Sequence, residues 1–473
     1  MNHFYENGRN MKYISTRGGI APISFKDAVM MGLATDGGLL LPQSLPKLSD
    51  KTIESWHNLE YQDLAYEVIS LFTDDMPEAD LRQLIAKSYA SFTHPDITPV
   101  AKHGEVHILE LFHGPTLAFK DVALQFLGNL FEYFLRADKA RMNILGATSG
   151  DTGSAAIYGV RGKERIKIFI LHPHKRVSPI QELQMTSVLD DNVFNLAIQG
   201  SFDSGQAIVK EIFNDLDFKK KHHLGAVNSI NWARILAQIV YYVYSYFRVC
   251  NSEGSEQVDF TVPTGNFGDI FAGFLAKRLL TAKRIRRLVL ATNENDILSR
   301  FVSQGVYATG DVSQTCSPSM DIQVASNFER YLYFLNDFDA DRTRNDMESF
   351  AANAVLRFDS TACDRVNDDF VSQRVTEPEI IATIKSFYEK NNYVLDPHTA
   401  VGVTAGISHK DKLPMICLAT AHPGKFGDVV GRAIGPQPLP DALAVLEGKK
   451  TRCEVIPAKS TVVKDFIERD DKL

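Results

Sequence analysis

The pattern of apolar residues predicts alternating strands and helices over most of the chain. Runs rich in apolar residues that fit buried strands occur at 106–111, 142–147, 166–171, 193–198, 260–263, 288–291 and 415–419. Between these runs apolar residues recur with helical spacing, as in 124–135. Strands that alternate with helices are typical of a parallel sheet covered on both faces. We therefore expect an α/β fold.

The first hundred residues follow another pattern. Glycines and prolines interrupt them, and two amphipathic stretches at 54–72 and 76–92 predict helices. We expect a mostly helical N-terminal domain over residues 1–100. Farther along, the acidic stretch 336–346 predicts a loop, whereas residues 376–379 have the form of a capping box that opens a helix.

The amino-acid composition is that of an ordinary folded protein and excludes several other classes. The chain has 473 residues, of which 44% are hydrophobic and 23% are charged, and its mean hydropathy is −0.13. Such a chain can bury a large core, which argues against disorder. The richest apolar stretch, 232–247, contains Arg234 and Gln238, so we expect a buried helix and no membrane span.

The net charge limits the kinds of partner that we expect, and the cysteine content limits the cellular compartment. The net charge of −7 argues against a nucleic acid or a polybasic membrane contact as the main partner. The basic residues within 277–287 are better explained by the solvated face and last turn of a helix. Five widely spaced cysteines form neither a disulfide framework nor a CxxC motif, and His172 and His174 lack further ligands at metal spacing. We expect a cytoplasmic protein without a metal site.

One turn after a predicted strand has the composition of an anion site. Ligands of open parallel sheets bind where the strands end, and residues 264–269 read Thr-Gly-Asn-Phe-Gly-Asp directly before a helical pattern. Glycines at such a turn let backbone N–H groups converge on an anion at the helix N-terminus. The spacing fits neither a dinucleotide fingerprint nor a P-loop, and it suits a monophosphate. A tight turn without a ligand, with Asn266 in the left-handed region, explains the residues equally well.

Two further turns carry reactive or polar side chains. Residues 147–153 place three hydroxyl residues and two glycines before a helix, more than one helix cap requires, which favours a second anion site. Lys120 stands at a helix start among apolar residues, where its amine is available as a nucleophile or base. A lysine that only extends to solvent is the alternative. A Schiff-base lysine combined with a monophosphate site indicates pyridoxal 5′-phosphate.

Seven longer motifs, in one order along the chain, resemble threonine synthase in the long form found in many bacteria and in fungi. They are YISTRG at 13–18, GLATDGGLLLP at 32–42, HGPTLAFK at 113–120, SGDTG at 149–153, NSINWARILAQ at 228–238, PTGNFGD at 263–269 and LATAHPGKF at 418–426. The resemblance implies a pyridoxal-phosphate enzyme of fold type II, similar to the β subunit of tryptophan synthase. Two lobes with mostly parallel, helix-covered open sheets would then follow the helical N-terminal domain.

The resemblance also implies domain boundaries. The large cofactor-binding domain would comprise residues 101–138 and 233–473, and the small α/β domain would comprise residues 139–232. The implied cofactor-binding residues are Lys120, Asp151, Gly265, Asn266, Phe267, Gly268, Asp269 and Thr420. The implied residues for the anionic groups of the substrate are Ser149, Thr152, Ser229 and Arg234.

Individual roles follow from the same resemblance. Lys120 would be the Schiff-base lysine and the acid/base, and the neutral hydroxyl of Thr420 would face the pyridine nitrogen and leave it largely unprotonated. Asp151 stands where relatives often carry an asparagine that contacts the ring hydroxyl, although a carboxylate brings a charge where an amide brings donors. Arg234 would bind phosphate through its fork of N–H groups. Judged from its neighbours alone, Arg234 is equally well explained by an ion pair at the edge of the core.

The implied reaction converts O-phospho-L-homoserine and water to L-threonine and phosphate by γ-elimination and β-addition of water. Lys120 would remove the α-proton, and either Lys120 or the departing phosphate would remove the β-proton. We expect a small-molecule substrate and a monomer or weak dimer. A phospholyase on related substrates, a binding-only relative and a nucleotide-binding protein are the alternatives, the last disfavoured by the glycine spacing.

Overall fold

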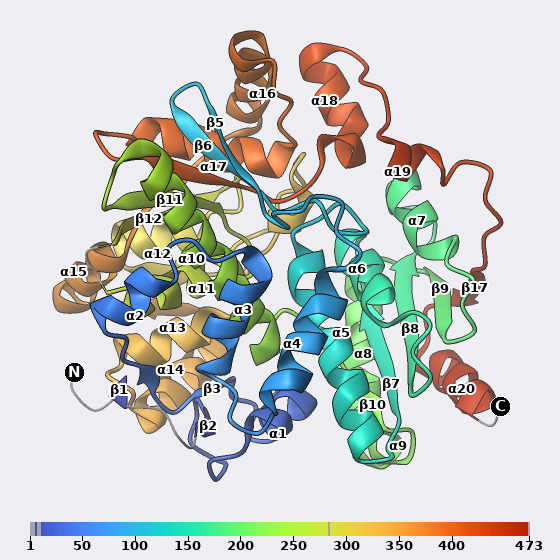
Figure 1. Cartoon of the computed structure of the whole chain (residues 1–473). Coiled ribbons are helices and arrows are strands. Elements are labelled where there is room, and N and C mark those ends of the chain that lie inside the picture. The colour runs from blue at the N-terminus through green and yellow to red at the C-terminus, as the bar shows by residue number, and fades with distance from the viewer. Residues whose placement is uncertain (1–4, 7–10, 282–283, 472–473) are drawn as a thin grey trace. The chain divides into compact units, whose positions relative to one another are not determined.

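The computed structural model describes residues 5–6, 11–281 and 284–471 (Figure 1). Its contacts divide the chain into two compact units, Met1–Gly114 with Ser229–Gln437, and Pro115–Asn228 with Pro438–Leu473. Each unit contains one large, mostly parallel sheet flanked by helices, and the first unit has small two-stranded sheets as well. The predicted α/β fold is therefore confirmed.

The larger sheet belongs to the first unit and has the strand order β15-β12-β11-β16-β6-β5. Its strands are β5 (Val100–His103), β6 (Val106–Glu110), β11 (Val258–Pro263), β12 (Ile285–Thr292), β15 (Phe370–Arg374) and β16 (Met415–Ala419). Only the edge pair β5 and β6 is antiparallel. The four inner strands are largely buried, which is why apolar runs predicted them. The edge strands β5 and β15 are half exposed and mixed in polarity, so the pattern missed them.

Helices and short turns surround this sheet. They are α10 (Trp232–Glu253), α11 (Gly268–Leu279), α12 (Ile297–Gln304), α13 (Phe328–Leu335), α14 (Ala340–Asn353), α15 (Ser360–Asp369), α16 (Glu377–Asn391), α17 (Pro397–His409), α18 (Gly427–Ile434) and the 3-10 turns η1 (Pro318–Met320) and η2 (Pro423–Phe426). Strands β13 (Val306–Ala308) and β14 (Val355–Arg357) form a separate antiparallel pair. Helix α10 is buried over most of its length, as expected. No helix in the described ranges is long and apolar enough to cross a membrane.

Two predictions about helix ends have different outcomes. The loop predicted at 336–346 is present at 336–339 but is wrong from residue 340 on, because α14 begins at Ala340 and the Asp339 carboxylate caps it by accepting from the Arg342 N–H at 2.9 Å. Its polar, largely exposed surface concealed the helical period. The capping box is confirmed, since the Thr376 N–H donates to the Glu379 carboxylate at 2.7 Å.

The expectation for the basic stretch is confirmed in part: Lys277 and Arg278 stand in the last turn of α11, as expected, but the stretch does not form a solvated helix face. Lys277 is buried near the end of α11 and donates to the Asp368 carbonyl at 2.8 Å. Arg286 and Arg287 lie on β12 and pair with the buried carboxylate of Asp259. These cations therefore hold elements together through ion pairs and hydrogen bonds. Lys283 lies outside the described residues.

The N-terminal residues of the first unit include more strands than expected. The elements are β1 (Tyr5–Glu6), β2 (Tyr13–Ser15), α1 (Phe25–Met31), β3 (Leu40–Pro42), β4 (Leu45–Pro46), α2 (Asp50–Ser55), α3 (Tyr61–Ser70) and α4 (Glu78–Tyr89). The single helix predicted at 54–72 is wrong, because the extended backbone of Glu60 separates α2 from α3. Buried Trp56 continues the apolar pattern into this break, so the pattern concealed it. That these residues form a domain of their own stays a prediction.

The second unit contains a parallel sheet with the order β10-β7-β8-β9-β17. Its strands are β7 (Met142–Ala147), β8 (Ile166–Pro173), β9 (Val193–Gln199), β10 (Leu224–Gly225) and β17 (Glu454–Pro457). Its helices are α5 (Lys120–Ala137), α6 (Asp151–Val160), α7 (Pro179–Thr186), α8 (Phe202–Asn214), α9 (Leu216–Lys221), α19 (Asp441–Ala444) and α20 (Ser460–Asp471). Apolar residues of α8, α9 and α20 cover one face of the sheet.

The two units group the segments differently from the predicted domains. Helix α5 packs on α6 so closely that a Cβ at Gly128 would lie 2.0 Å from the Gly159 carbonyl oxygen. Strand β17 comes from the C-terminal residues and pairs with β9, as the red and green strands of Figure 1 show. Both segments therefore belong to the unit that contains residues 139–228.

Candidate active site

In the second unit, buried hydrogen bonds hold the turn that leads to Lys120. Lys120 is the first residue of α5 and is 9% exposed. The next residue, Asp121, is fully buried, and its carboxylate accepts from the N–H and the hydroxyl of Thr116 at 2.8 and 2.7 Å. The Lys120 amine lies 3.7 Å from the Asp151 carboxylate and 5.5 Å from the centre of the Phe119 ring. The amine is thus held at a helix start between an acidic and an aromatic group.

The hydroxyl-rich turn of the same unit begins α6. Thr148 Oγ1 accepts from the N–H groups of Gly150 and Gly153 at 3.0 and 2.9 Å, so Thr148 caps the turn. The hydroxyls of Ser149 and Thr152 make no hydrogen bond within the described part of the chain, so neither is used as a cap. This arrangement leaves two hydroxyl donors at a helix N-terminus, as an anion site requires.

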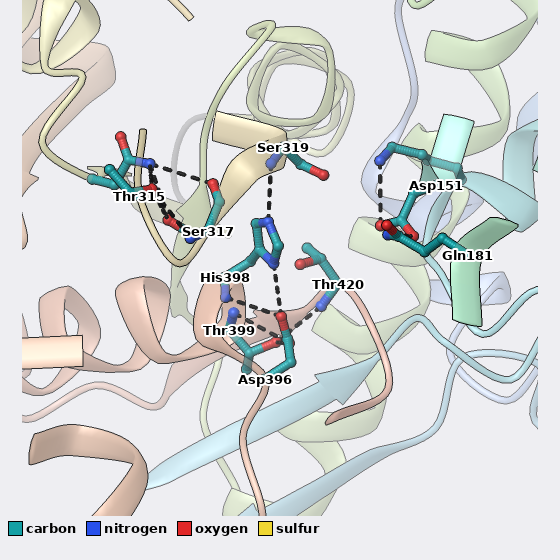
Figure 2. A network of polar contacts seen from close by, with 11 residues as sticks. Asp151, Gln181, Thr315, Ser317, Ser319, Asp396, His398, Thr399 and Thr420 are labelled. Carbon is teal, nitrogen blue, oxygen red and sulfur yellow. Dashed lines mark hydrogen bonds and ion pairs between the residues drawn. The ribbon is translucent and has the colours of Figure 1, made fainter. Parts of the chain in front are cut away.

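Asp151 has a partner that the sequence did not indicate. Gln181 Nε2 donates to its carboxylate at 2.8 Å, from α7, and Figure 2 shows the two side chains facing one another. The carboxylate is buried between this amide and Lys120. A buried carboxylate beside an amine favours the protonated form of that amine.

The glycine turn of the first unit links β11 to α11. A Cβ at Gly265 would lie 2.8 Å from the Ser319 carbonyl oxygen, so only glycine fits there without movement. The left-handed residue is Phe267, with φ 65°, and not Asn266, which the ligand-free alternative placed in that region. The Phe267 ring is buried, so its side chain points into the core while its backbone shapes the turn. The Asn266 carbonyl accepts from the N–H and the side-chain amide of Asn327 at 3.0 and 3.1 Å.

Asp269 has a different environment from the other residues of this turn. Its carboxylate accepts from the hydroxyls of Tyr241 and Tyr242 at 2.6 and 2.8 Å, and so connects α11 to α10. Oδ2 has no partner in the described residues. Burial raises the pKa of Asp269 to about 6, and the two tyrosine hydroxyls act in the opposite direction.

Arg234 is a buried cation that has no counter-charge among the described residues. It lies in the first turn of α10, is 5% exposed, and its Nε and Nη1 have no partner in the described residues. Burial lowers its pKa to about 10. The ion pair considered above as an alternative is absent from the described residues. Ser229 lies five residues earlier, and its hydroxyl is 2.8 Å from that of Ser326 and 3.3 Å from the Asn327 amide.

Thr420 directly follows β16, where its backbone is fixed from a distant segment. Its N–H donates to Thr399 Oγ1 at 3.1 Å, and Thr399 in turn donates to Asp396 (Figure 2). Sequence reasoning missed Asp396, Gln181 and Asn327. Asp396 precedes a proline, which is a helix-start signal, but its effect on Thr420 spans more than twenty residues.

Known protein families match this chain over almost its whole length. Three family models match it: "Threonine synthase N terminus" at residues 12–89, "Pyridoxal-phosphate dependent enzyme" at 98–415 and "Threonine synthase, C-terminal" at 399–467. The curated threonine synthase of Schizosaccharomyces pombe is 47% identical over 90% of this chain and 89% of its own. The chain belongs to the threonine synthase family.

Solved threonine synthase structures have the same fold. The pyridoxal-phosphate-bound enzyme from Brucella melitensis is 43% identical with a TM-score of 0.94, and it covers 98% of this chain and 100% of its own. The yeast threonine synthase is 45% identical with a TM-score of 0.92, and it covers 97% of this chain and 98% of its own. The expected family and fold are both confirmed.

The motifs typical of threonine synthase at the N-terminus are anchored to α13. The hydroxyl of Thr16 and the guanidinium of Arg17 donate to the Glu329 carboxylate at 2.6 to 2.9 Å. The Leu40 carbonyl accepts from fully buried Arg330, which also donates to the Asn327 side chain. Because Asn327 holds the Asn266 carbonyl, the N-terminal motifs support the glycine turn.

Proposed function

We propose that this chain is a pyridoxal-phosphate-dependent threonine synthase that converts O-phospho-L-homoserine and water to L-threonine and phosphate. The observation that carries the proposal is the similarity to threonine synthases over nearly the full length of both chains, with Lys120 at the motif position. The buried guanidinium of Arg234, which has no ion-pair partner in the part of the chain that the structure describes, supports an anionic substrate, because an isolated buried cation is unfavourable until an anion joins it.

The residues fit the cofactor. The Gly265 turn ends at the N-terminus of α11, where backbone N–H groups suit a phosphate, and the close approach to Ser319 requires glycine. We assign the phosphate to residues 265–269, with Asp269 contributing through its backbone because its carboxylate contacts two tyrosines. The neutral hydroxyl of Thr420 would face the pyridine nitrogen. When bound, pyridoxal phosphate supplies an aldehyde for amines and a ring that accepts electrons from the α-carbon.

Lys120 would bind the cofactor and then transfer protons. Its amine is nine-tenths buried beside the Asp151 carboxylate, which favours the protonated amine. We propose that Asp151, held by Gln181, stabilises the protonated amine of Lys120 after that amine has taken a proton from the substrate. The assignment of Asp151 to the ring hydroxyl of the cofactor rests on the family resemblance alone.

Four residues would bind the anionic groups of the substrate. Arg234 has N–H groups at Nε and Nη1 without a partner in the described residues, and a guanidinium with free N–H groups donates well to phosphate oxygens. The hydroxyls of Ser149, Thr152 and Ser229 would donate to the remaining oxygens. Because these donors are fixed before the reaction, they stabilise the charge that develops on the departing phosphate.

The decisive experiment is product analysis with O-phospho-L-homoserine and the pyridoxal-phosphate-loaded chain. We expect equal amounts of phosphate and L-threonine, and no activity in the Lys120→Ala variant. Release of 2-oxobutyrate and ammonia in place of threonine would indicate a phospholyase, because water would not have been added at the β-carbon. A chain that binds no pyridoxal phosphate would overturn the proposal entirely.

We also propose a cytoplasmic location and a monomer or weak dimer. All five cysteines are free, which fits a reducing compartment. Sedimentation of the purified chain at several concentrations tests the oligomeric state.

A further inference from the structure

A chain of hydrogen bonds runs from Thr420 to Ser319, whose turn η1 lies next to the Gly265 turn (Figure 2). The Thr420 N–H donates to Thr399 Oγ1 at 3.1 Å, and the Thr399 hydroxyl donates to Asp396 Oδ2. Asp396 Oδ1 lies 2.9 Å from His398 Nδ1, and the Ser319 N–H donates to His398 Nε2 at 3.1 Å. We call this chain, from Thr420 through Thr399, Asp396 and His398 to Ser319, the relay.

The partners of His398 fix its tautomer. A backbone N–H can only donate, so Nε2 must accept from Ser319 and carries no proton. Nδ1 therefore carries the proton and donates to Asp396. A ring in this state cannot rotate by half a turn without losing both bonds, so the relay has one orientation.

The relay is buried and starts at a helix end. Asp396, His398 and Thr399 are each at most 3% exposed. Asp396 is also the N-cap of α17, and it accepts from the backbone N–H groups of His398 and Thr399 at 2.9 and 3.3 Å. A satisfied polar network in a buried site is rigid, because each lost bond leaves an unsatisfied group.

At its Ser319 end the relay lies next to the Gly265 turn, which is proposed to hold the cofactor phosphate. Ser319 lies in η1, and its carbonyl oxygen is the atom that a Cβ at Gly265 would approach to 2.8 Å. The loop around η1 is fixed from β12 as well, because Asn293 Nδ2 donates to the hydroxyls of Thr315 and Ser317 at 2.8 and 2.9 Å. One peptide segment therefore contacts His398 on one side and the Gly265 turn on the other.

We propose that Asp396 and His398 are positioning residues that hold Thr420 and the Gly265 turn at a fixed separation. The inference rests on the proposed function, in which Thr420 faces the pyridine nitrogen and residues 265–269 hold the phosphate. The relay then connects the protein groups at the two ends of one rigid cofactor. It contacts neither substrate nor reacting atoms, so its effect is on how well the cofactor fits.

Two substitutions cut the relay at different points. His398→Asn retains an amide donor near the Nδ1 position for Asp396 and removes the acceptor for the Ser319 N–H. Thr399→Val retains the shape of the side chain and removes the hydroxyl between Thr420 and Asp396. His409→Asn, at the other end of α17, is the control, because His409 lies outside the relay.

The test measures binding of two ligands to the cofactor-free full chain by absorbance titration. The ligands are pyridoxal 5′-phosphate and pyridoxal, which lacks the phosphate. For His398→Asn we expect the affinity for pyridoxal phosphate to fall about ten-fold and that for pyridoxal to change less than about two-fold. For Thr399→Val we expect both affinities to fall by a similar factor, about ten-fold. The control should bind both ligands as the unsubstituted chain does.

The double variant tests whether the two ends are coupled. If Thr420 and the Gly265 turn are coupled through the relay, the affinity for pyridoxal phosphate falls in the double variant by a smaller factor than the product of the two single-variant factors. The visible circular dichroism of the bound cofactor should change in each single variant, because it reports on the orientation of the ring. Should His398→Asn fail to fold, His398→Gln replaces it in the cycle, since it keeps an acceptor near Nε2 and breaks the Asp396 contact.

The outcomes separate this inference from the proposed function. Equal losses for both ligands in His398→Asn, or no loss for either, would overturn the inference, and so would multiplicative losses in the double variant. Each of these results would leave the proposed function intact. An unsubstituted chain that binds no pyridoxal phosphate would overturn the proposed function and the inference together.

Discussion

At the scale of single residues, Arg234 and Arg330 are a natural pair for comparison. Both guanidiniums are buried, and burial lowers the pKa of Arg234 to about 10 and that of Arg330 to about 9. Arg330 donates to the carbonyls of Leu40 and Ile230, whereas Nε and Nη1 of Arg234 have no partner in the described residues. One of these cations stabilises the fold, and the other is available to a ligand.

We therefore expect Arg234→Met to separate stability from function. The cofactor-free variant should melt at the same temperature as the unsubstituted chain or a few degrees higher, because an unpaired buried charge is removed. Its kcat/KM for O-phospho-L-homoserine should fall about a hundred-fold or more, while the cofactor stays bound. Calorimetry and steady-state phosphate release measure the two quantities.

Arg330→Met is the matched control and should behave in the opposite way. Its removal leaves buried carbonyl oxygens without donors, so the melting temperature should fall by several degrees. Unchanged kinetics in Arg234→Met, or a drop in its melting temperature as large as that of Arg330→Met, would contradict the assignment of Arg234 to the substrate.

Lys120→Ala gives the second prediction at this scale. The variant should lose the visible absorbance band of lysine-bound cofactor and at least about a thousand-fold of its turnover, because the Schiff-base amine and the proton carrier are the same group. Lys210→Ala, on the exposed side of α8, should change neither property. An intact band with normal turnover in Lys120→Ala would remove Lys120 from the mechanism.

At the scale of elements, the carboxylate of Asp269 joins α11 to α10 through two tyrosines. Its folded pKa of about 6 lies above its ordinary value of 3.8. Between these values the folded chain binds more protons than the unfolded chain, so the free energy of unfolding falls as pH rises through that window. Above about pH 6 the destabilisation by the buried Asp269 charge has reached its full value and no longer changes with pH.

Asp269→Asn should remove this pH dependence. The amide cannot ionise, and its oxygen can still accept from a tyrosine hydroxyl. In the cofactor-free chain we expect the variant to gain stability relative to the unsubstituted chain between pH 4 and pH 6, by a melting shift on the order of 2–4 °C. A melting difference that stays constant over this range would show that Asp269 is charged throughout.

How much of the fold the sequence predicted depends on where each element lies. The inner strands β6, β11, β12 and β16 were found because both of their faces are buried. Strands β5 and β15 and helix α14 were missed because water on one side breaks the apolar period.

The candidate site divides in a similar way. Its candidate residues were predicted through the resemblance, but the groups that hold them in place were not predicted. Gln181 reaches Asp151 across thirty residues, and Asn327 reaches Asn266 across sixty-one. No local pattern contains such pairs. For the same reason the ligand-free alternative placed the left-handed residue of the glycine turn at Asn266, whereas the structure has it at the aromatic Phe267.

At the scale of the whole molecule, the overall charge and the charge of the site have opposite signs. The chain carries a net charge of −7, yet its proposed ligands are anions. Attraction must therefore be local, from helix N-termini, Lys120 and Arg234, whose buried guanidinium is only 5% exposed. Salt screens exposed charges strongly and buried ones weakly.

This contrast predicts an unusual salt dependence. Between about 0.05 and about 0.5 M KCl, the KM for O-phospho-L-homoserine should stay constant or fall by up to about two-fold, because salt screens the long-range repulsion and not the buried contacts. Initial-rate measurements at fixed pH test this. A KM that rises about ten-fold over the same range would mean that exposed lysines and arginines bind the substrate.

The pairing of β17 with β9 also constrains how the chain can fold as it is synthesised. The unit that contains Lys120 has its other strands within residues 142–225, but its edge strand is Glu454–Pro457. While the ribosome is still translating the intervening two hundred or so residues, the β9 edge has open hydrogen-bonding groups and the apolar face covered by α20 is exposed. During that interval the nascent chain presents a binding surface for chaperones, and a stop codon before residue 454 would make that surface permanent.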